Sequence, residues 1–385
     1  MKIAILGFGT VGRGVLACVE HINDIEIVKI LDRQLNDEYP KLMTIDYQTI
    51  IDDQSIDAVV ECMGGLHPAY EYVSQAFKAH KHVVTSNKAL VSAFYQDLIT
   101  CANKNNVHFS FTSSAGGAIP WLSSLKRAKR SDDIVSVHGI VNGTSNYILD
   151  NMANGKLSFA DALKAAQDLG YAEADPSADI KGYDTMRKCV ISANIAFDTL
   201  IDEKDVLVMG IQKITISDMN FFKKHDYRCR LIMEASLHID KVSAYVEPTL
   251  FDMNALESNV CSNNNLITFN GKNTGDLSFY GQGAGKLQTG NAIVQDLLDI
   301  KDHQVVTQKL GKMLVIDNTY VKHAYYLRSK VTSDILTDVI DQQEIIAGNS
   351  FIITKPISVV AAHKLACEIA LSDTDYFMAG IKESN

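Results

Sequence analysis

A chain of 385 residues is longer than a typical single domain, so the length predicts two or three domains with a large buried core. Hydrophobic residues make up 46% and charged residues 21% of the chain, which is typical of soluble globular proteins and excludes disordered and fibrous classes. The formal net charge of −10 argues against a nucleic-acid partner or an anionic membrane surface, and the longest basic cluster is the short patch at residues 126–130.

The chain also lacks the sequence marks of export. No apolar run reaches the roughly 18 residues of a membrane span, and the apolar run after Met1-Lys2 does not have the pattern of a signal peptide. Seven cysteines lie scattered from Cys18 to Cys367 without a C-x-x-C pair, which is typical of reduced thiols and disfavours a zinc site. We therefore expect a cytoplasmic protein without a membrane partner.

The N-terminal third alternates short β-branched runs with amphipathic stretches. This alternation predicts a parallel sheet with crossover helices, that is, a doubly wound α/β domain. Strands are expected at residues 3–6, 25–31, 57–62, 82–86 and 107–112. Helices are expected at residues 11–21, 68–80 and 89–103.

The remainder of the chain follows other patterns. Residues 134–141 and 228–246 alternate like half-buried strands, and helices are expected at 158–169 and 182–198, so the middle of the chain predicts a mixed α+β sheet. After residue 301 the order is strand, helix, two strands, helix, strand, which indicates a small ferredoxin-like domain. These elements are expected at residues 320–327, 333–340, 344–347, 351–357, 359–371 and 375–381.

A G-x-G-x-x-G motif, Gly7-Phe8-Gly9-Thr10-Val11-Gly12, lies between the first strand and the first helix. Such a loop lets the backbone approach a pyrophosphate at a helix N-terminus, so it predicts dinucleotide binding. The alternative is a glycine turn that serves only strand-to-helix packing. Asp32 at the end of the second strand favours NAD through the ribose hydroxyls, whereas the adjacent Arg33 favours NADP, so the cofactor preference stays open.

Two polar segments end expected strands. The first, residues 85–88, ends in Lys88, which either contacts a ligand or is a solvated lysine at a helix start. In the second, residues 139–149, backbone N–H groups and the Thr144 hydroxyl could bind a carboxylate, although an ordinary N-capping loop would have the same composition.

The densest polar cluster covers residues 170–188. Asp184 and Lys188 are four residues apart on one helix face, a spacing that usually means a weak surface ion pair. The residues after Lys188 are apolar on most sides, however, so we expect this lysine to begin a buried helix. A partly buried lysine beside a carboxylate can exchange a proton with an alcohol.

Taken together, five segments resemble homoserine dehydrogenases and occur in that family's order over about 300 residues. They are the glycine loop 7–12, Asn87-Lys88, the segment 142–149, the run 170–188, and Gly281-Gln282-Gly283-Ala284-Gly285 with Thr289 and Asp296. The resemblance implies an oxidoreductase that interconverts L-homoserine and L-aspartate 4-semialdehyde with NAD or NADP, in threonine, methionine and isoleucine biosynthesis.

The resemblance also implies roles for individual residues. Lys188 would donate and accept the proton at the substrate oxygen, with Lys88 beside the nicotinamide. Glu173 would bind the substrate ammonium, and Asp179 and Asp184 would shape the site.

Further residues follow from the same resemblance. The remaining polar atoms of the amino acid would meet Tyr171, Gly143 and Thr144. The implied cofactor-binding residues are Gly7, Phe8, Gly9, Thr10, Val11, Gly12, Asp32, Arg33, Cys62, Met63, Lys88 and Gly283. Family loops that hold sodium through backbone carbonyls usually carry Glu where this chain has Thr112. The carbonyls survive the change, so the implied sodium ligands are Thr112, Ala115, Gly117 and Ile119.

The implied organisation has three domains. A Rossmann domain at residues 1–125 receives residues 281–305, a catalytic and dimerisation domain covers 126–280, and an ACT-like domain covers 315–385. We expect a monofunctional chain that forms a homodimer or higher oligomer and that an amino acid such as threonine regulates through the last domain.

Two other functions remain open. The chain could be another Rossmann NAD(P) dehydrogenase of a small amino-acid-derived alcohol, or a non-catalytic sensor of nucleotides and amino acids. Comparing the turnover of homoserine with that of other small alcohols tests the first alternative. Ligand binding without any turnover would favour the second.

Overall fold

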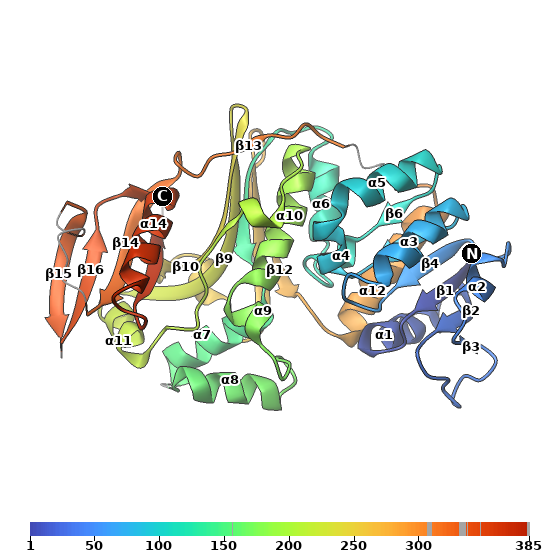
Figure 1. Cartoon of the computed structure of the whole chain (residues 1–385), viewed down its shortest axis with the longest axis horizontal. Helices are drawn as coiled ribbons and strands as arrows, with labels where there is room; N and C mark the ends of the chain where they lie inside the picture. The colour runs from blue at the N-terminus through green and yellow to red at the C-terminus, as the bar shows by residue number, and fades with distance from the viewer. Residues whose placement is uncertain (156, 306–309, 331–335, 337, 347, 383–385) are drawn as a thin grey trace. The chain divides into compact units, whose positions relative to one another are not determined.

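The computed structural model describes the whole chain except residues 156, 306–309, 331–335, 337, 347 and 383–385 (Figure 1). The chain forms two compact units. The first contains residues 1–133, 194–203 and 281–313, and the second contains residues 134–193, 204–280 and 314–385. Among the described residues, no helix has both the length and the apolar character needed to cross a membrane.

The first unit is built on a parallel sheet with the strand order β3-β2-β1-β4-β5-β6. The bounds are β1 Lys2–Leu6, β2 Glu26–Leu31, β3 Met43–Thr44, β4 Ala58–Glu61, β5 His82–Thr85 and β6 Phe109–Ser110. This order is that of a doubly wound dinucleotide-binding domain, whose ligand crevice lies where the order reverses, at the carboxyl ends of β1 and its neighbours. The predicted fold class of the first domain is therefore confirmed.

Helices of this unit follow the expected periodicity with one interruption. They are α1 Thr10–Val19, α2 Gln48–Ile51, α3 Ala69–Lys78, α4 Lys88–Ala93, α5 Tyr95–Lys104, α6 Trp121–Ala128 and α12 Lys286–Lys301. The helix expected at 89–103 is divided because Phe94 leaves helical geometry, with φ −123° and ψ 26°. The last expected strand is also shorter, because a 3-10 helix, Thr112–Ser114, follows β6.

Distant segments share the core of the first unit. Apolar residues of β1 and α1 pack with Ile293 and Leu297 of α12, which is drawn in orange beside the blue helix α1 in Figure 1. Gly14 and Gly290 permit this close approach, since a Cβ at Gly290 would lie 2.5 Å from the carbonyl carbon of Gly14. The return of the segment after residue 281 to the nucleotide-binding unit thus has a packing cause.

The second unit contains one long mixed sheet with the path β12-β11-β7-β9-β10-β18-β14-β16-β15, and β8, β13 and β17 pair beside it. Its strands are β7 Ile134–Ile140, β8 Leu207–Val208, β9 Tyr227–His238, β10 Lys241–Asp252, β11 Asn264–Gly271, β12 Gly275–Gln282, β13 Val315–Ile316, β14 Lys322–Ser329, β15 Ile340–Ile346, β16 Asn349–Thr354, β17 Ile357–Ser358 and β18 Phe377–Lys382. The alternating segment expected at 228–246 is a hairpin of β9 and β10 that turns at Ile239. The predicted mixed sheet is confirmed.

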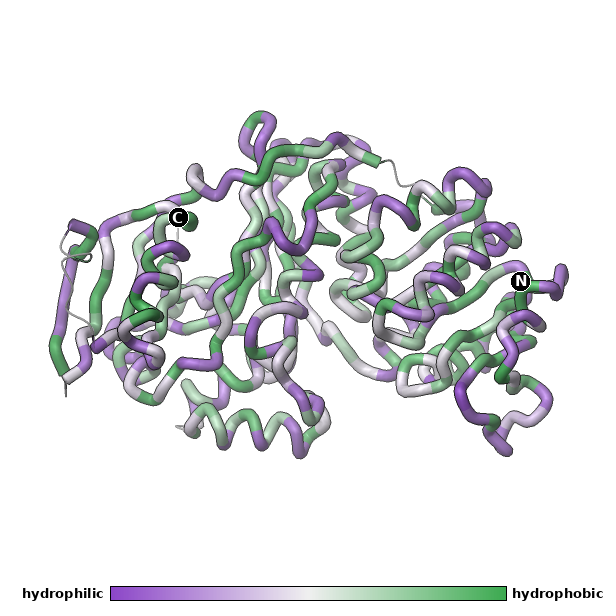
Figure 2. Tube along the Cα trace, in the orientation of Figure 1, coloured by the Kyte–Doolittle hydropathy of each residue, from purple (hydrophilic) through white to green (hydrophobic). Residues whose placement is uncertain are grey.

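Helices of the second unit are α7 Gly143–Gly155, α8 Phe159–Asp168, α9 Ser177–Ile180, α10 Tyr183–Phe197, α11 Ile216–Lys224 and α14 Val359–Ala370. The last residues of α10 (194–197) and of β12 (281–282) group with the first unit. Most of α10 is buried, including Cys189, Val190 and Ile191. By contrast, α8 alternates hydrophobic and hydrophilic residues and buries only one face (Figure 2). These two patterns separate a core helix from a surface helix.

The domain boundaries differ from the expected ones at two places. Residues 126–133 and 194–203 group with the first unit, where Lys129 donates to the Ile195 carbonyl and pairs with Asp198 at 2.6 Å. The C-terminal residues share a sheet with the second unit, because β18 pairs in parallel with β10 and antiparallel with β14. Strands β18, β14, β16 and β15 keep the order of a ferredoxin-like sheet, while half of the helix expected at 333–340 lies outside the described residues.

Candidate active site

The glycine loop connects β1 to the N-terminus of α1. Gly7 has φ +92°, and a Cβ there would lie 2.9 Å from the Cys62 carbonyl oxygen, while a Cβ at Gly12 would overlap the carbonyl oxygen of Gly7. Both positions therefore exclude larger residues. At Gly9, in contrast, a Cβ would meet no atom within 4 Å, and no side chain caps the helix. Open space in front of uncapped N–H groups fits a dinucleotide pyrophosphate.

A cavity of about 450 Å³ lies beside this loop. It is lined by residues of the carboxyl ends of β1, β2 and β4, among them Gly7, Asp32, Arg33, Cys62 and Met63. The structure thus brings these predicted cofactor-binding residues together around one cavity. Burial raises the pKa of the Cys62 thiol well above its usual value, so Cys62 lines the cavity as a neutral thiol.

Asp32 has a structural role in addition to the predicted one. Its carboxylate accepts the backbone N–H of Phe8 at 2.6 Å through one oxygen and that of Arg33 at 2.6 Å through the other. These bonds tie the second strand to the glycine loop and orient the carboxylate, which keeps lone pairs for a ribose hydroxyl. Arg33 is exposed beside it, so the two residues with opposite cofactor preferences line one cavity.

Glu61 is a buried carboxylate that the sequence reasoning missed. It accepts the Met63 N–H at 2.8 Å and the Thr85 hydroxyl at 2.6 Å, and none of its surface is exposed. Burial raises the pKa of Glu61, while these hydrogen bonds oppose that rise. Glu61 shapes the turn after β4 from within. A lone acid at the end of an apolar strand, Ala58-Val59-Val60-Glu61, was the available signal.

The segment around Lys88 lies at the next strand end. Asn87 caps α4 by accepting the Leu90 N–H at 3.1 Å, and its amide donates to the Gly65 carbonyl at 2.7 Å. Lys88 is the first residue of α4 and is half-buried. Asn87 is therefore the N-cap of α4, and Lys88 lies at a helix start at the carboxyl edge of the sheet.

The two loops expected near the cofactor and the sodium ion meet in the first unit. A Cβ at Gly117 would overlap the carbonyl oxygen of Gly283, so the segments 112–119 and 281–285 pack backbone to backbone. Of the predicted sodium ligands, Thr112 begins a 3-10 helix, Ala115 and Ile119 are buried, and the Ile119 carbonyl accepts the Trp121 N–H at 2.6 Å. Among the described residues, no group of three or more His, Cys, Asp or Glu side chains forms a metal site.

The second unit holds the buried ion pair. Lys188 and Asp184 are 7% and 4% exposed, and the Lys188 Nζ lies 2.8 Å from Asp184 Oδ2. The ammonium also donates to the Val141 carbonyl at 2.5 Å. The spacing alone suggests a surface ion pair, but the structure shows a buried pair at the start of helix α10. An amine held in this way keeps a fixed direction for proton exchange.

Asn142 joins this pair to the neighbouring loops. Its Nδ2 donates to Asp184 Oδ2 at 2.8 Å and to Asp179 Oδ1 at 2.6 Å, and its Oδ1 accepts the Ser145 N–H at 2.7 Å. One side chain therefore caps α7 and holds two predicted site carboxylates. Asn142 was quoted in the motif but was not among the predicted site residues. Its position before a Gly-Thr helix start was the available signal.

The other predicted substrate residues lie close by in the same unit. Thr144 Oγ1 donates to the Tyr171 carbonyl at 2.6 Å, which uses the hydroxyl proton that was expected to bind a carboxylate. Only backbone N–H groups at the start of α7 are then left for that task. Tyr171 and Glu173 are exposed, and a Cβ at Gly143 would lie 2.7 Å from the Asn263 carbonyl oxygen.

A doubly wound sheet with a glycine loop at its switch point, together with a buried lysine and carboxylate, defines a nicotinamide-dependent oxidoreductase. Comparison with known proteins gives the same class. Residues 7–112 match the family model described as "Homoserine dehydrogenase, NAD binding domain", and residues 120–298 match "Homoserine dehydrogenase". The chain belongs to the homoserine dehydrogenase family, so the resemblance in its motifs is confirmed.

Individual relatives agree with this assignment. The chain is 35% identical to homoserine dehydrogenase of Bacillus subtilis, over 87% of this chain and 79% of that one. It is 36% identical to the Corynebacterium glutamicum enzyme, over 79% of this chain and 72% of the relative. The crystal structure of a homoserine dehydrogenase from Thiobacillus denitrificans matches with a TM-score of 0.89 at 30% identity, covering 100% of this chain and 98% of the other. The enzyme class, an oxidoreductase acting on CH–OH, is confirmed.

Proposed function

We propose that this chain interconverts L-homoserine and L-aspartate 4-semialdehyde with NAD or NADP. The nicotinamide, when bound, accepts or returns the hydride at the carbon that carries the substrate oxygen. The chain must therefore bind the nucleotide, orient the amino acid and manage one proton. The glycine loop and the cavity beside it support the first task, and the polar cluster of the second unit supports the other two.

Lys188 carries the proton in this proposal. In the oxidative direction the neutral amine takes the hydroxyl proton as the C–H bond breaks and the carbonyl forms. In the reductive direction the ammonium returns a proton to the carbonyl oxygen. Asp184 stabilises the ammonium form, because a desolvated cation needs a paired anion. The single observation that carries the proposal is this buried ammonium, held by Asp184 and Val141.

The remaining roles follow the geometry of the same cluster. Glu173 binds the substrate ammonium, while Tyr171 and the backbone N–H groups of Gly143 and Thr144 meet the other polar atoms. Asp179, held by Asn142, borders the site. Lys88 contributes from the sheet edge of the first unit.

Replacing Lys188 with Met tests the proposal, with Lys181→Met as the control because Lys181 is an exposed lysine seven residues earlier. We expect homoserine oxidation to fall by at least about 10²-fold in the first variant, with unchanged NAD(P)H affinity by fluorescence titration, and near-normal turnover in the control. Normal turnover in the Lys188 variant would contradict the proton role. Turnover of another alcohol in place of homoserine by the unmodified enzyme would contradict the substrate.

We further propose a homodimer or higher oligomer in the cytoplasm, a role in threonine, methionine and isoleucine biosynthesis, and amino-acid regulation through an ACT-like domain at residues 315–385. The ferredoxin-like strand order of β18, β14, β16 and β15 supports the last of these.

Sodium binding at residues 112–119 stays a prediction. The four candidate carbonyls carry no net charge, the Ile119 carbonyl already accepts a hydrogen bond, and we assign no step to a cation.

A further inference from the structure

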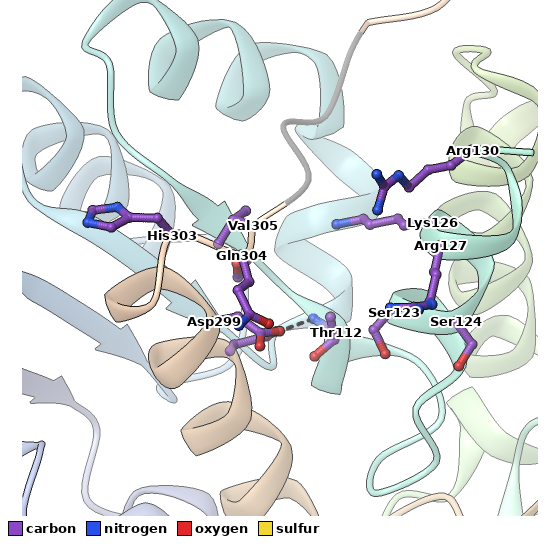
Figure 3. A pocket seen from close by; sticks show the side chains of 12 residues that line it. Thr112, Ser123, Ser124, Lys126, Arg127, Arg130, Asp299, His303, Gln304 and Val305 are labelled. Carbon is purple, nitrogen blue, oxygen red and sulfur yellow. Dashed lines mark hydrogen bonds between the residues drawn. The ribbon is translucent and has the colours of Figure 1, made fainter.

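A second cavity of about 670 Å³ lies in the first unit, between α6 and the segment that runs from α12 to residue 305 (Figure 3). Its lining includes Thr112 and side chains of both charges, and none of its lining residues borders the cavity beside the glycine loop. The charged residues that carry the argument are Lys126, Arg127, Arg130, Asp296 and Asp299. The proposed function uses none of them.

One wall of this cavity is cationic. Lys126, Arg127 and Arg130 come from the end of α6 and the turn after it, and they lie on one side of the view in Figure 3. Within the part of the chain that the structure describes, none of the three forms an ion pair or a hydrogen bond through its side chain. Lys129 on the same segment shows the contrast, since it pairs with Asp198 at 2.6 Å.

Lys126 is the most enclosed of these cations. Its Nζ lies 4.7 Å from the centroid of the Phe111 ring, and burial lowers the pKa of the ammonium. A cation over an aromatic face gains some stabilisation, but it does not recover the hydrogen bonds that water would supply. Its charge would be stabilised by an anion that enters the cavity.

The opposite wall is acidic. Asp296 is 3% exposed, and its Oδ2 accepts the Thr112 N–H at 3.0 Å. Burial raises the pKa of Asp296 to about 6. Asp299 lies three residues further along α12, and burial followed by the charge of Asp302 raises its pKa as well. Among the described residues, neither carboxylate lies within ion-pair distance of a cation of the other wall, although the charge of Lys126 partly offsets the rise in the pKa of Asp296.

We propose that this cavity binds a small amino dicarboxylate such as L-glutamate. Its two carboxylates would meet the cations of α6, and its ammonium would meet the carboxylates of α12. Three cations facing two carboxylates leave one net positive charge, which matches a ligand with two carboxylates and one ammonium. A dianion without an ammonium would leave the acidic wall unpaired. The proposal does not depend on the reaction assigned to the second unit.

Basic residues at the end of a helix also occur simply because they complement the helix dipole. That alternative predicts no saturable binding. Isothermal titration of the full chain with L-glutamate separates the two, with glutarate, which lacks the ammonium, and inorganic phosphate as comparison probes. We expect saturable glutamate binding in the millimolar range or tighter and at least about tenfold weaker binding of glutarate and phosphate.

Variants then locate the binding. Arg127→Gln and Arg130→Gln change exposed residues, so the fold is retained, and each should weaken glutamate binding about tenfold. Lys104→Gln is the matched control, because Lys104, like Arg127, is an exposed cation in the last turn of a helix of this unit, and it lies outside the cavity. Asp299→Asn should reduce the preference for glutamate over glutarate. Absent binding, equal binding of the three probes, or unchanged binding in both arginine variants would each overturn the proposal.

Discussion

The side-chain amide of Asn142 donates a hydrogen bond of 2.8 Å to Asp184 Oδ2, the same oxygen that pairs with the Lys188 ammonium. Because one carboxylate oxygen serves both groups, the position of the amine depends on an amide that is itself fixed by capping α7 through Ser145. Asn142 is thus a positioning residue in the proposed reaction.

Replacing Asn142 tests this relationship. Asn142→Ser keeps a helix-capping hydroxyl but removes the amide donor to Asp184 and Asp179, so we expect turnover reduced about 10²-fold and a free energy of unfolding lowered by about 1–3 kcal/mol. The measurement is kcat alongside the melting temperature. Asn151→Ala is the control, because Asn151 bonds only to a carbonyl within its own helix. A lower melting temperature with an unchanged kcat for the folded variant would instead indicate a purely structural role.

The glycine loop offers a matched pair of substitutions. Gly9→Ala adds a Cβ where the protein has no atom within 4 Å, so stability should be unchanged, while the added methyl obstructs the pyrophosphate and raises the KM for NAD(P) at least about tenfold. Gly12→Ala should lower the free energy of unfolding by about 1–3 kcal/mol, because its Cβ overlaps the Gly7 carbonyl. Urea unfolding and steady-state kinetics of both variants check the pair. Equal stabilities would contradict the packing argument.

Cofactor preference is expected to divide between two adjacent residues. Arg33→Gln should raise the KM for NADPH about tenfold and leave that for NADH nearly unchanged, because only the 2′-phosphate needs the guanidinium. Asp32→Asn should raise the KM for NADH more than the KM for NADPH. Kinetics with both nucleotides measure the effect, with Lys104→Gln as the control for loss of one exposed charge. Equal changes for both nucleotides would contradict the assignment.

Asp296 predicts a specific pH dependence of stability. Burial raises its folded-state pKa from 3.8 to about 6, so between these pH values the folded chain binds more protons than the unfolded chain. The contribution of this group therefore falls as pH rises through that window, by up to about 3 kcal/mol. Asp296→Asn removes the titration and keeps an acceptor for the Thr112 N–H. Relative to the unmodified chain, the variant should gain stability from pH 4 to 7 in urea unfolding. A difference that does not vary with pH would contradict this expectation.

Much of the first unit could be predicted because its information is local. Alternating β-branched runs and helical periods specify strands and helices, and glycines at 7, 9 and 12 specify a tight turn before a helix. The break at Phe94 and the hairpin turn at Ile239 were not predicted, since neither position carries a glycine or proline.

The candidate site also contains features that local spacing predicts and features that depend on distant residues. The spacing of Asp184 and Lys188 placed them on one helix face, and the apolar residues that follow indicated burial. Local signals marked Glu61 and Asn142 as unusual positions, but the sequence could not predict their hydrogen-bond partners. Thr85 is 24 residues from Glu61, and Asp179 and Asp184 are 37 and 42 residues from Asn142.

By itself, the sequence determined the family, the order of the elements and the residue types available for hydride and proton transfer, because those depend on local spacing and motif order. Only the tertiary structure decided that Lys188 is desolvated, that Asn142 holds two carboxylates, and that three cations of α6 and the turn after it face a cavity without ion-pair partners among the described residues. The physical reason is that desolvation and charge pairing depend on which distant segments meet, and chain spacing does not encode those meetings.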